Sequence, residues 1–285
     1  MPALPEVEVI RRDLEKEIVG RRIKEADIRS GSNAMKVFPK HGRRKEIQEL
    51  LEGAKVEGVS RVGMKLVFDL DNGHEMLIDL GPSGQLHKTS ASDDVVSHTH
   101  LIIGFTIGGQ LRYVDPMKSG EIYIAPKQSD ADGDGRKRDF LIDPLEDQIA
   151  WQRFGEVMAE RAVGMKKLLM DDSFVIGLGD IYSDEILFAS GIRGDRMSNK
   201  LSSQDVRRLY RALIEILQDA VKARGVAPTG DSDEEYTDLH GESGSFEAEL
   251  KVYQREGASC RRCRNTIVKE EVDGMVTYFC PQCQS

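Results

Sequence analysis

The sequence predicts a two-domain α+β protein, with an N-terminal β-sandwich led by a helix and a C-terminal helical domain that ends in a four-cysteine zinc finger. Apolar runs separated by turn residues fill the first half, helical apolar spacing fills the second, and paired cysteines close the chain. A length of 285 residues with 39% hydrophobic residues favours two globular domains. The expected divisions are 1–125 for the β domain, 126–144 for a linker, 145–250 for the helical domain and 251–285 for the zinc finger.

The first domain is expected to begin with an amphipathic helix. The run ends at Gly20, and the apolar residues that repeat at helical spacing before it are Val7, Ile10, Leu14 and Ile18. From residue 55 to about 123, runs rich in Val, Ile, Leu and Phe alternate with turn signals such as Asp71-Asn72-Gly73, as in a β-sandwich. The segment 126–144 is polar and rich in Gly, Asp and basic residues, which is typical of a linker.

The second domain is predicted to be helical up to the cysteines. Helical spacing begins near Leu145 and returns strongly in 203–224. Between these, 166–170 is predicted as a helix, 177–179 as a tight turn and 180–189 as a second helix. Asp180 would cap that second helix, although its charge would compete with a phosphate for the free N–H groups there.

All four cysteines of the chain lie near its end, in two CxxC pairs. Their spacing is typical of a tetrahedral zinc site with four thiolate ligands: Cys260, Cys263, Cys280 and Cys283. Two disulfides in a secreted tail are the alternative. No signal peptide and no run of about twenty apolar residues is visible. We therefore expect a reducing cytoplasm, at the nucleoid in a bacterium, and no membrane association.

The start of the chain offers a candidate nucleophile. Removal of Met1 would leave Pro2 with a secondary amine, and an α-amino group has a pKa of about 8, so roughly a tenth is neutral at pH 7. Such an amine attacking a sugar aldehyde gives a cationic iminium, which can accept electrons. The alternative is that Met1-Pro2 marks an ordinary processed terminus.

Both ends of the chain, and several segments between them, resemble the formamidopyrimidine-DNA glycosylase and endonuclease VIII family of base-excision repair enzymes. The resemblance covers nearly the whole chain. Its most specific segments are 2–8, 169–185 and 252–257, which runs into the cysteines, with weaker echoes at 81–84 and 115–120. It implies a DNA glycosylase and AP lyase whose helical domain carries a helix-two-turns-helix motif.

The resemblance also implies roles for individual residues. Pro2 is expected to attack C1′ of the sugar and form an imine, while Glu6 and Glu185 help to place the terminus. Contacts to damaged double-stranded DNA, bound by a monomer, are expected from a further group: Lys118, Lys166, Lys167, Asp180, Arg261 and Arg262. One Zn²⁺ on the four cysteines would be structural, because four thiolates leave no open position for water. Glu6 and Glu185 are equally interpretable as ordinary fold-stabilising carboxylates.

Several positions depart from the family pattern. Ala3 stands where the family has a proton-transferring Glu, and Met64 where it has a Lys near the scissile base. The family fills the gap left by an extruded nucleotide with a Met, here Pro82, and with an Arg-Arg-Phe run, here 117–119. There are three further departures: Asp180 at the helix start, Met275 in the zinc hairpin and the acidic segment 231–235. We therefore expect base excision to suffer more than imine chemistry on an abasic aldehyde.

Two functions from different classes remain open. One is a DNA glycosylase and AP lyase, and the other is a paralogue that binds distorted DNA without cutting it. The formal charge of −9 argues against a general polyanion binder, but basic residues gather at 43–45 and in the zinc segment, so DNA binding stays open. A zinc ribbon with unrelated upstream domains, binding RNA or protein, would leave the matches at Pro2 and 177–185 unexplained.

Overall fold

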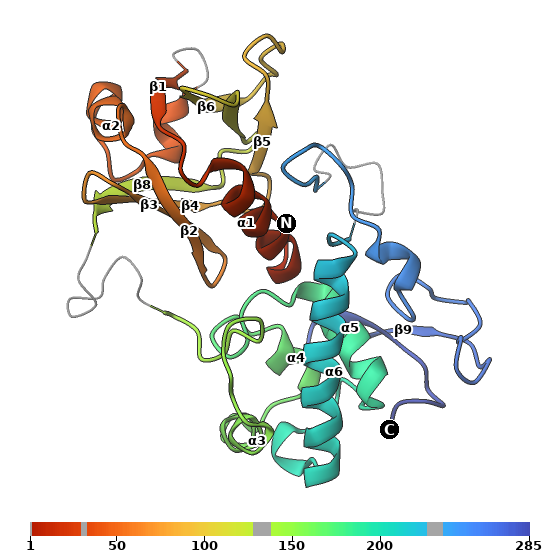
Figure 1. The fold of residues 1–285 in the computed structure, drawn as a ribbon. Coiled ribbons are helices and arrows are strands. Elements are labelled where there is room, and N and C mark those ends of the chain that lie inside the picture. The colour runs from red at the N-terminus through yellow and green to blue at the C-terminus, as the bar shows by residue number, and fades with distance from the viewer. Residues whose placement is uncertain (1, 30–32, 128–137, 227–235) are drawn as a thin grey trace. The chain divides into compact units, whose positions relative to one another are not determined.

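The structure, a computed structural model, describes residues 2–29, 33–127, 138–226 and 236–285. The chain forms two compact units (Figure 1), one of Met1–Arg138 and Arg224–Gly244 and the other of Asp139–Ala223 and Ser245–Ser285. The first unit therefore includes a return segment, Arg224–Gly244, that the expected boundaries placed in the helical domain. The acidic segment 231–235 and much of the expected linker lie outside the described residues.

Two antiparallel sheets form the sandwich of the first unit. The strand order is β1-β6-β7-β5 in one sheet and β2-β3-β4-β8 in the other. The strands are β1 (Ile23–Ile28), β2 (Val56–Val62), β3 (Lys65–Leu70), β4 (His74–Asp79), β5 (Gln85–Thr89), β6 (Thr99–Phe105), β7 (Gln110–Val114) and β8 (Glu121–Pro126). The predicted sandwich is confirmed, but its first strand, β1, lies before residue 55. The short helix η2 (Ala34–Val37) and helix α2 (Arg44–Leu51) lie between β1 and β2.

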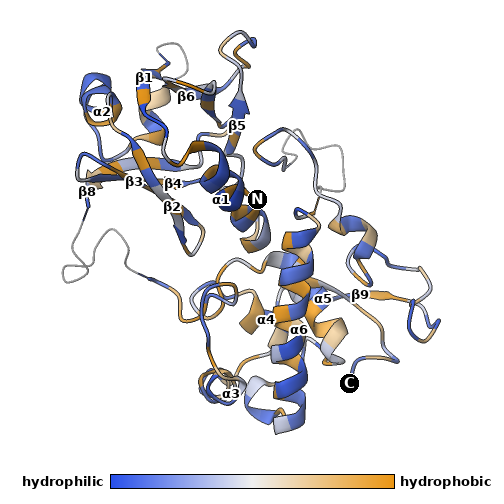
Figure 2. Ribbon diagram, viewed as in Figure 1, coloured by the Kyte–Doolittle hydropathy of each residue, from blue (hydrophilic) through white to orange (hydrophobic). Residues whose placement is uncertain are grey.

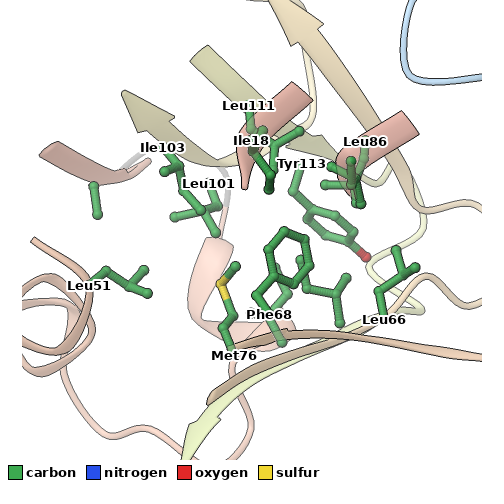
Figure 3. Packing of buried hydrophobic residues seen from close by; sticks show 14 of the residues in the cluster. Ile18, Leu51, Leu66, Phe68, Met76, Leu86, Leu101, Ile103, Leu111 and Tyr113 are labelled. Atoms are coloured by element: carbon green, nitrogen blue, oxygen red, sulfur yellow. The ribbon is translucent and has the colours of Figure 1, made fainter. Parts of the chain in front are cut away.

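The core of this unit lies between the two sheets and helix α1 (Leu4–Ile18). Figure 3 shows Phe68 and Met76 of one sheet facing Leu101 and Tyr113 of the other, and none of these four side chains is more than 1% exposed. Helix α1 packs against this core through the apolar residues that its spacing predicted, such as Ile10. The predicted amphipathic helix is therefore present and places Pro2 at its start.

The second unit is helical and ends in a hairpin. Its helices are α3 (Trp151–Ala159), α4 (Met165–Leu169), α5 (Gly179–Ser190), η3 (Ser198–Lys200), α6 (Ser203–Lys222) and η4 (Phe246–Glu249), followed by β9 (Val268–Val272) and β10 (Met275–Phe279). Helix α6 carries both hydrophobic and hydrophilic residues along its length (Figure 2). A capping box formed by Ser202 and Asp205 lies at its N-terminus. Every helix in the described ranges is too short or too polar to span a lipid bilayer.

Candidate active site and zinc centre

Pro2 is buried at the start of α1, and Glu6 fixes the backbone next to it. The Glu6 carboxylate accepts a hydrogen bond from the Ala3 N–H at 3.0 Å through Oε2 and from the Val226 N–H at 2.9 Å through Oε1. Glu6 is only 3% exposed. It therefore links Ala3, the residue after Pro2, to the return segment. This geometry suits the role expected for Glu6, which is to place the N-terminus.

The return segment is held on α1 by a second, ionic contact. The Arg224 guanidinium contacts Asp13 of α1 and lies 2.7 Å from the Asp238 carboxylate. Both carboxylates are buried, with side-chain exposures of 8% for Asp13 and 2% for Asp238. The Tyr236 hydroxyl adds a contact to the Glu6 carbonyl oxygen at 3.5 Å. Residues on this segment are thereby fixed against the helix that carries Pro2.

Glu8 anchors the same helix on the sandwich. Its carboxylate lies 3.0 Å from Arg11, 2.7 Å from Arg12 and 3.2 Å from Arg61 of β2. Burial alone would raise the pKa of Glu8, but hydrogen bonds from Arg11 and Arg12 and the charges of Arg11 and Arg61 outweigh it and hold the pKa below its usual value. Glu8 therefore stays ionised and fixes the direction of α1.

Four of the positions expected to depart from the family pattern carry no titratable side chain. Ala3 is half-buried, and Met64 packs against the hydrophobic core of the first unit. Neither side chain can donate or accept a proton, so neither can serve as a general acid or base. Pro82 is exposed and Met275 is half-buried in the second unit.

Lys166 lies inside the second unit and not on its surface. Its side chain is 0% exposed, and Nζ donates to the Asp184 carboxylate and to Ser183 Oγ, each at 2.8 Å. This placement corrects the expectation that Lys166 contacts DNA, because a buried ammonium with protein partners presents no surface to a phosphate. The neighbouring Lys167 is exposed, and for it a DNA contact stays a prediction.

Asp180 does not cap α5. Leu178 occupies the N-cap position and makes no side-chain cap hydrogen bond, while Asp180 lies in the first turn of the helix. Its side chain is 56% exposed, with Oδ1 3.9 Å from Lys166 Nζ. The capping interpretation is therefore wrong, although a carboxylate in the first turn still complements the helix dipole. A phosphate approaching this end of α5 would meet that charge.

Asp184 and Glu185, consecutive residues of α5, hold the zinc-finger segment. Glu185 is 1% exposed. Its carboxylate accepts hydrogen bonds from the backbone N–H groups of Lys251, Val252 and Tyr253 at 2.9–3.0 Å. Asp184 accepts from Thr277 Oγ1 at 2.7 Å and from the N–H of Tyr278 at 2.9 Å, both in β10. These bonds give Glu185 a structural role within its own unit, and its catalytic role stays a prediction.

The four cysteines converge on one point. Their Sγ atoms lie within 4.8 Å of one another, with Cys260 and Cys283 3.9 Å apart and Cys263 and Cys280 3.4 Å apart. A tetrahedral zinc with bonds of about 2.3 Å separates its sulfurs by about 3.8 Å, so the cluster fits one structural Zn²⁺. Bound there, the metal would stabilise the hairpin and supply no reaction chemistry, since the four thiolates fill its coordination shell.

Arg261 and Arg262, in the first cysteine knuckle, are exposed but partly engaged by the protein. Arg261 Nη1 donates to the Ala248 carbonyl oxygen at 3.1 Å. The Arg262 guanidinium stacks 4.4 Å from the centre of the Phe188 ring and donates to the Phe188 carbonyl oxygen at 3.3 Å. The DNA contacts expected of both residues stay predictions.

Four residues that organise these sites were not singled out as site residues from the sequence: Asp13, Asp184, Arg224 and Asp238. Their partners are distant in sequence, and Asp13 and Arg224 are separated by 211 residues.

Three family models match the chain. The formamidopyrimidine-DNA glycosylase N-terminal domain matches residues 1–122, the formamidopyrimidine-DNA glycosylase H2TH domain matches 141–229, and the zinc finger found in FPG and IleRS matches 259–285. The formamidopyrimidine-DNA glycosylase of Pelotomaculum thermopropionicum is 32% identical over 287 residues, covering 100% of this chain and 99% of the relative. That of Desulfitobacterium hafniense is 33% identical over 284 residues, covering 100% of both.

A solved structure shows the same fold. The complex between the Lactococcus lactis Fpg and an abasic site containing DNA matches with a TM-score of 0.86 and 30% identity, covering 99% of each chain. Sandwich, helix-two-turns-helix unit and four-cysteine finger together define the class of zinc-finger DNA glycosylases. The chain belongs to the formamidopyrimidine-DNA glycosylase family, whose members are glycosylases and AP lyases of base-excision repair, and the resemblance seen in the sequence is confirmed.

Glu185→Gln should destabilise the second unit. The variant replaces a carboxylate that accepts backbone N–H groups by an amide whose NH₂ would face them, so we expect a loss of about 1–3 kcal/mol in the free energy of unfolding, measured by urea titration. Glu215→Gln is the matched control, because the Glu215 side chain is 57% exposed. Unchanged stability together with reduced imine formation would instead show that Glu185 is catalytic.

The zinc prediction is tested by metal analysis. The reduced protein should contain one zinc ion per chain, and Cys280→Ser should lose it, because the Cys280 thiolate is one of four ligands and is 0% exposed. Chelation should unfold the hairpin, since structural zinc contributes folding free energy directly. Two disulfides in protein isolated without reductant, with no zinc, would contradict the assignment.

Proposed function

We propose that this chain is an AP lyase that acts through Pro2 on abasic sites in double-stranded DNA, and that it removes damaged bases much more slowly. The observation that carries the proposal is the Glu6 carboxylate, which holds the Ala3 N–H at 3.0 Å and so fixes the peptide next to Pro2. The proposed nucleophile precedes a fixed peptide, while Ala3, the next residue, and Met64 carry no proton-transfer group.

The chemistry needs little beyond the amine. Neutral Pro2 nitrogen adds to C1′ of the ring-opened sugar, and loss of water leaves a cationic iminium. A C2′ proton is then lost to water or a nearby base, and the electron pair expels the phosphate from C3′ and breaks the C3′–O bond. Hydrolysis of the iminium returns free Pro2. Excision of an intact base must first break a glycosidic bond, where general acid–base help is worth about 10²–10⁴ in rate.

Borohydride trapping tests the nucleophile. The Met1-processed protein should form a covalent adduct with an abasic duplex, because borohydride reduces the iminium to a stable amine. An otherwise identical protein with an acetylated terminus should form none, and mass spectrometry of a proteolytic digest should place the adduct on Pro2. Retained binding to the duplex without any adduct would contradict the proposal and favour the non-catalytic DNA-binding paralogue.

Ala3→Glu tests why base excision is slow. Placing a carboxylate beside Pro2 should raise the rate of base release from a formamidopyrimidine-containing duplex by about 10- to 1000-fold, while trapping on the abasic duplex changes by less than about threefold. Ala3→Gln is the control of matched size, and it should not raise the rate. Base release by the unaltered protein as fast as its abasic cleavage would refute the proposed preference.

A further inference from the structure

The Glu6 side chain is enclosed by the backbone that it binds. Its carboxylate accepts the Ala3 N–H at 3.0 Å and the Val226 N–H at 2.9 Å. Gly225, with a φ of +84°, lies so close that a Cβ on it would be 2.7 Å from Glu6 Oε1. Taking up a proton would remove the charge that strengthens both hydrogen bonds. Glu6 is therefore suited to placing the terminus and is a poor general base.

Tyr236 contacts the Glu6 carbonyl oxygen at 3.5 Å and carries the next titratable group of the return segment. The residue is 8% exposed. Burial and the charge of Glu6 raise the pKa of Tyr236, so the phenol keeps its proton at neutral pH. A protonated phenol can donate a hydrogen bond, but it cannot remove a proton from a sugar carbon.

The carboxylates further along α1 and the return segment are paired with arginines. Burial would raise the pKa of Glu8, but three arginine side chains at 2.7–3.2 Å outweigh it and lower the pKa. Asp13 and Asp238 both contact Arg224. Burial would raise the pKa of Asp238 as well, but hydrogen bonds from two backbone N–H groups and from Arg224 lower it. A carboxylate with a lowered pKa is a weaker base.

The residues beside the nucleophile supply no base either. The side chains of Ala3 and Met64 have no group that can take up a proton. The Pro2 nitrogen cannot fill this role once it has reacted, because the iminium uses its lone pair. The start of the first unit therefore offers a placed amine, while its described carboxylates hold backbone N–H groups and arginines.

The two eliminations that an abasic sugar can undergo differ in their need for a base. The C2′ proton lies next to the iminium carbon, and its loss to water expels the phosphate from C3′ and leaves a C2′=C3′ double bond. A second elimination would remove the C4′ proton, break the C5′–O bond and expel the phosphate there. The iminium activates C4′ only through the new double bond, so this step depends more on a positioned base, which is worth about 10²–10⁴ in rate.

We propose that this chain carries out the first elimination and stops. One strand end then carries the sugar remnant as a 3′ unsaturated aldehyde, and the other end carries a 5′-phosphate. The inference rests on the proposed function, because it concerns what the Pro2 iminium does after the first strand break. Once that break has formed, hydrolysis of the iminium and release of the nicked duplex compete with a second elimination that has no positioned base.

The substrate and the product define the neighbouring reactions. The abasic aldehyde must come from a reaction that hydrolyses a glycosidic bond, since we propose that this chain breaks that bond slowly. The unsaturated aldehyde has no 3′ hydroxyl from which a polymerase could extend. It must be consumed by hydrolysis of the phosphodiester that joins the remnant to its strand, which restores a 3′ hydroxyl. The chain therefore acts between a hydrolytic base-removing reaction and a hydrolytic trimming of 3′ ends.

Product analysis tests the inference. The full-length, Met1-processed protein is incubated with a 5′-labelled duplex that holds one abasic site. The labelled ends are separated on a denaturing gel beside a piperidine-treated marker that ends in 3′-phosphate. When half of the substrate is cut, the aldehyde end should exceed the 3′-phosphate end by at least about tenfold, because the second step has no general base. A smaller excess, or 3′-phosphate as the main product, overturns the inference.

A coupled extension assay identifies the same end by its reactivity. The nicked product is treated with either a 3′-phosphodiesterase or a 3′-phosphatase, and a DNA polymerase is then added. Extension should follow the phosphodiesterase and not the phosphatase, because a phosphatase cannot remove a sugar remnant. Extension after the phosphatase alone would show a 3′-phosphate end and would overturn the inference.

Ala3→Glu tests whether the missing base limits the second step. A carboxylate beside Pro2 should raise the ratio of 3′-phosphate to aldehyde ends by at least about tenfold, while borohydride trapping changes by less than about threefold. Ala3→Gln is the control of matched size and should leave the ratio unchanged. An Ala3→Glu variant that is trapped like wild type without a higher ratio contradicts the inference. If the variant does not fold, the two assays on the wild type decide.

The outcomes separate this inference from the proposed function. Trapping by the wild type together with 3′-phosphate ends overturns the single elimination and leaves the lyase intact. A wild type that binds the abasic duplex but forms neither an adduct nor a strand break overturns the lyase, and the single elimination with it.

Discussion

The buried carboxylate of Glu6 needs hydrogen-bond donors, and this requirement organises the backbone of the candidate active site. An unpaired carboxylate inside a protein costs several kcal/mol. The N–H groups of Ala3 and Val226 both donate to Glu6 and offset part of that cost. The start of α1 and the return segment therefore both contribute donors to the same carboxylate. The Arg224 contacts to Asp13 and Asp238 hold the same segment from the other side, so the position of Pro2 depends on residues far along the chain, as the 211-residue separation of Asp13 and Arg224 shows.

The same device recurs at two other places. Asp115 accepts hydrogen bonds from the backbone N–H groups of Lys118 and Gly120 and from the Ser83 hydroxyl. Glu185 accepts from three successive N–H groups of the segment before the zinc finger. Buried charges of this kind contribute little net stability, since desolvation offsets much of the attraction. They do restrict the backbone to one arrangement, because any other leaves charge unsatisfied. A protein that must hold loops and termini in fixed positions gains more from that restriction than from additional apolar packing.

Local patterns predicted much of this molecule, and distant contacts account for what they missed. Alternating strands, the spacing of α1 and the cysteine pairs are set by neighbours in sequence, and each is present. Lys166 was misjudged because a lysine in a polar helix looks exposed until its partner Asp184, on another helix, is known. Asp180 was misjudged because the helix begins one residue earlier than the turn pattern indicated. The return segment joined the sandwich through contacts to α1 that no window of sequence contains.

The departures expected around Pro2 are consistent with one substrate. Under the proposed function, an abasic sugar already carries the aldehyde that an amine attacks, so it needs no group that protonates a leaving base. Ala3 and Met64 supply none. An abasic site also offers no damaged base to recognise, so under this proposal the reaction depends mainly on where Glu6 holds the backbone beside Pro2.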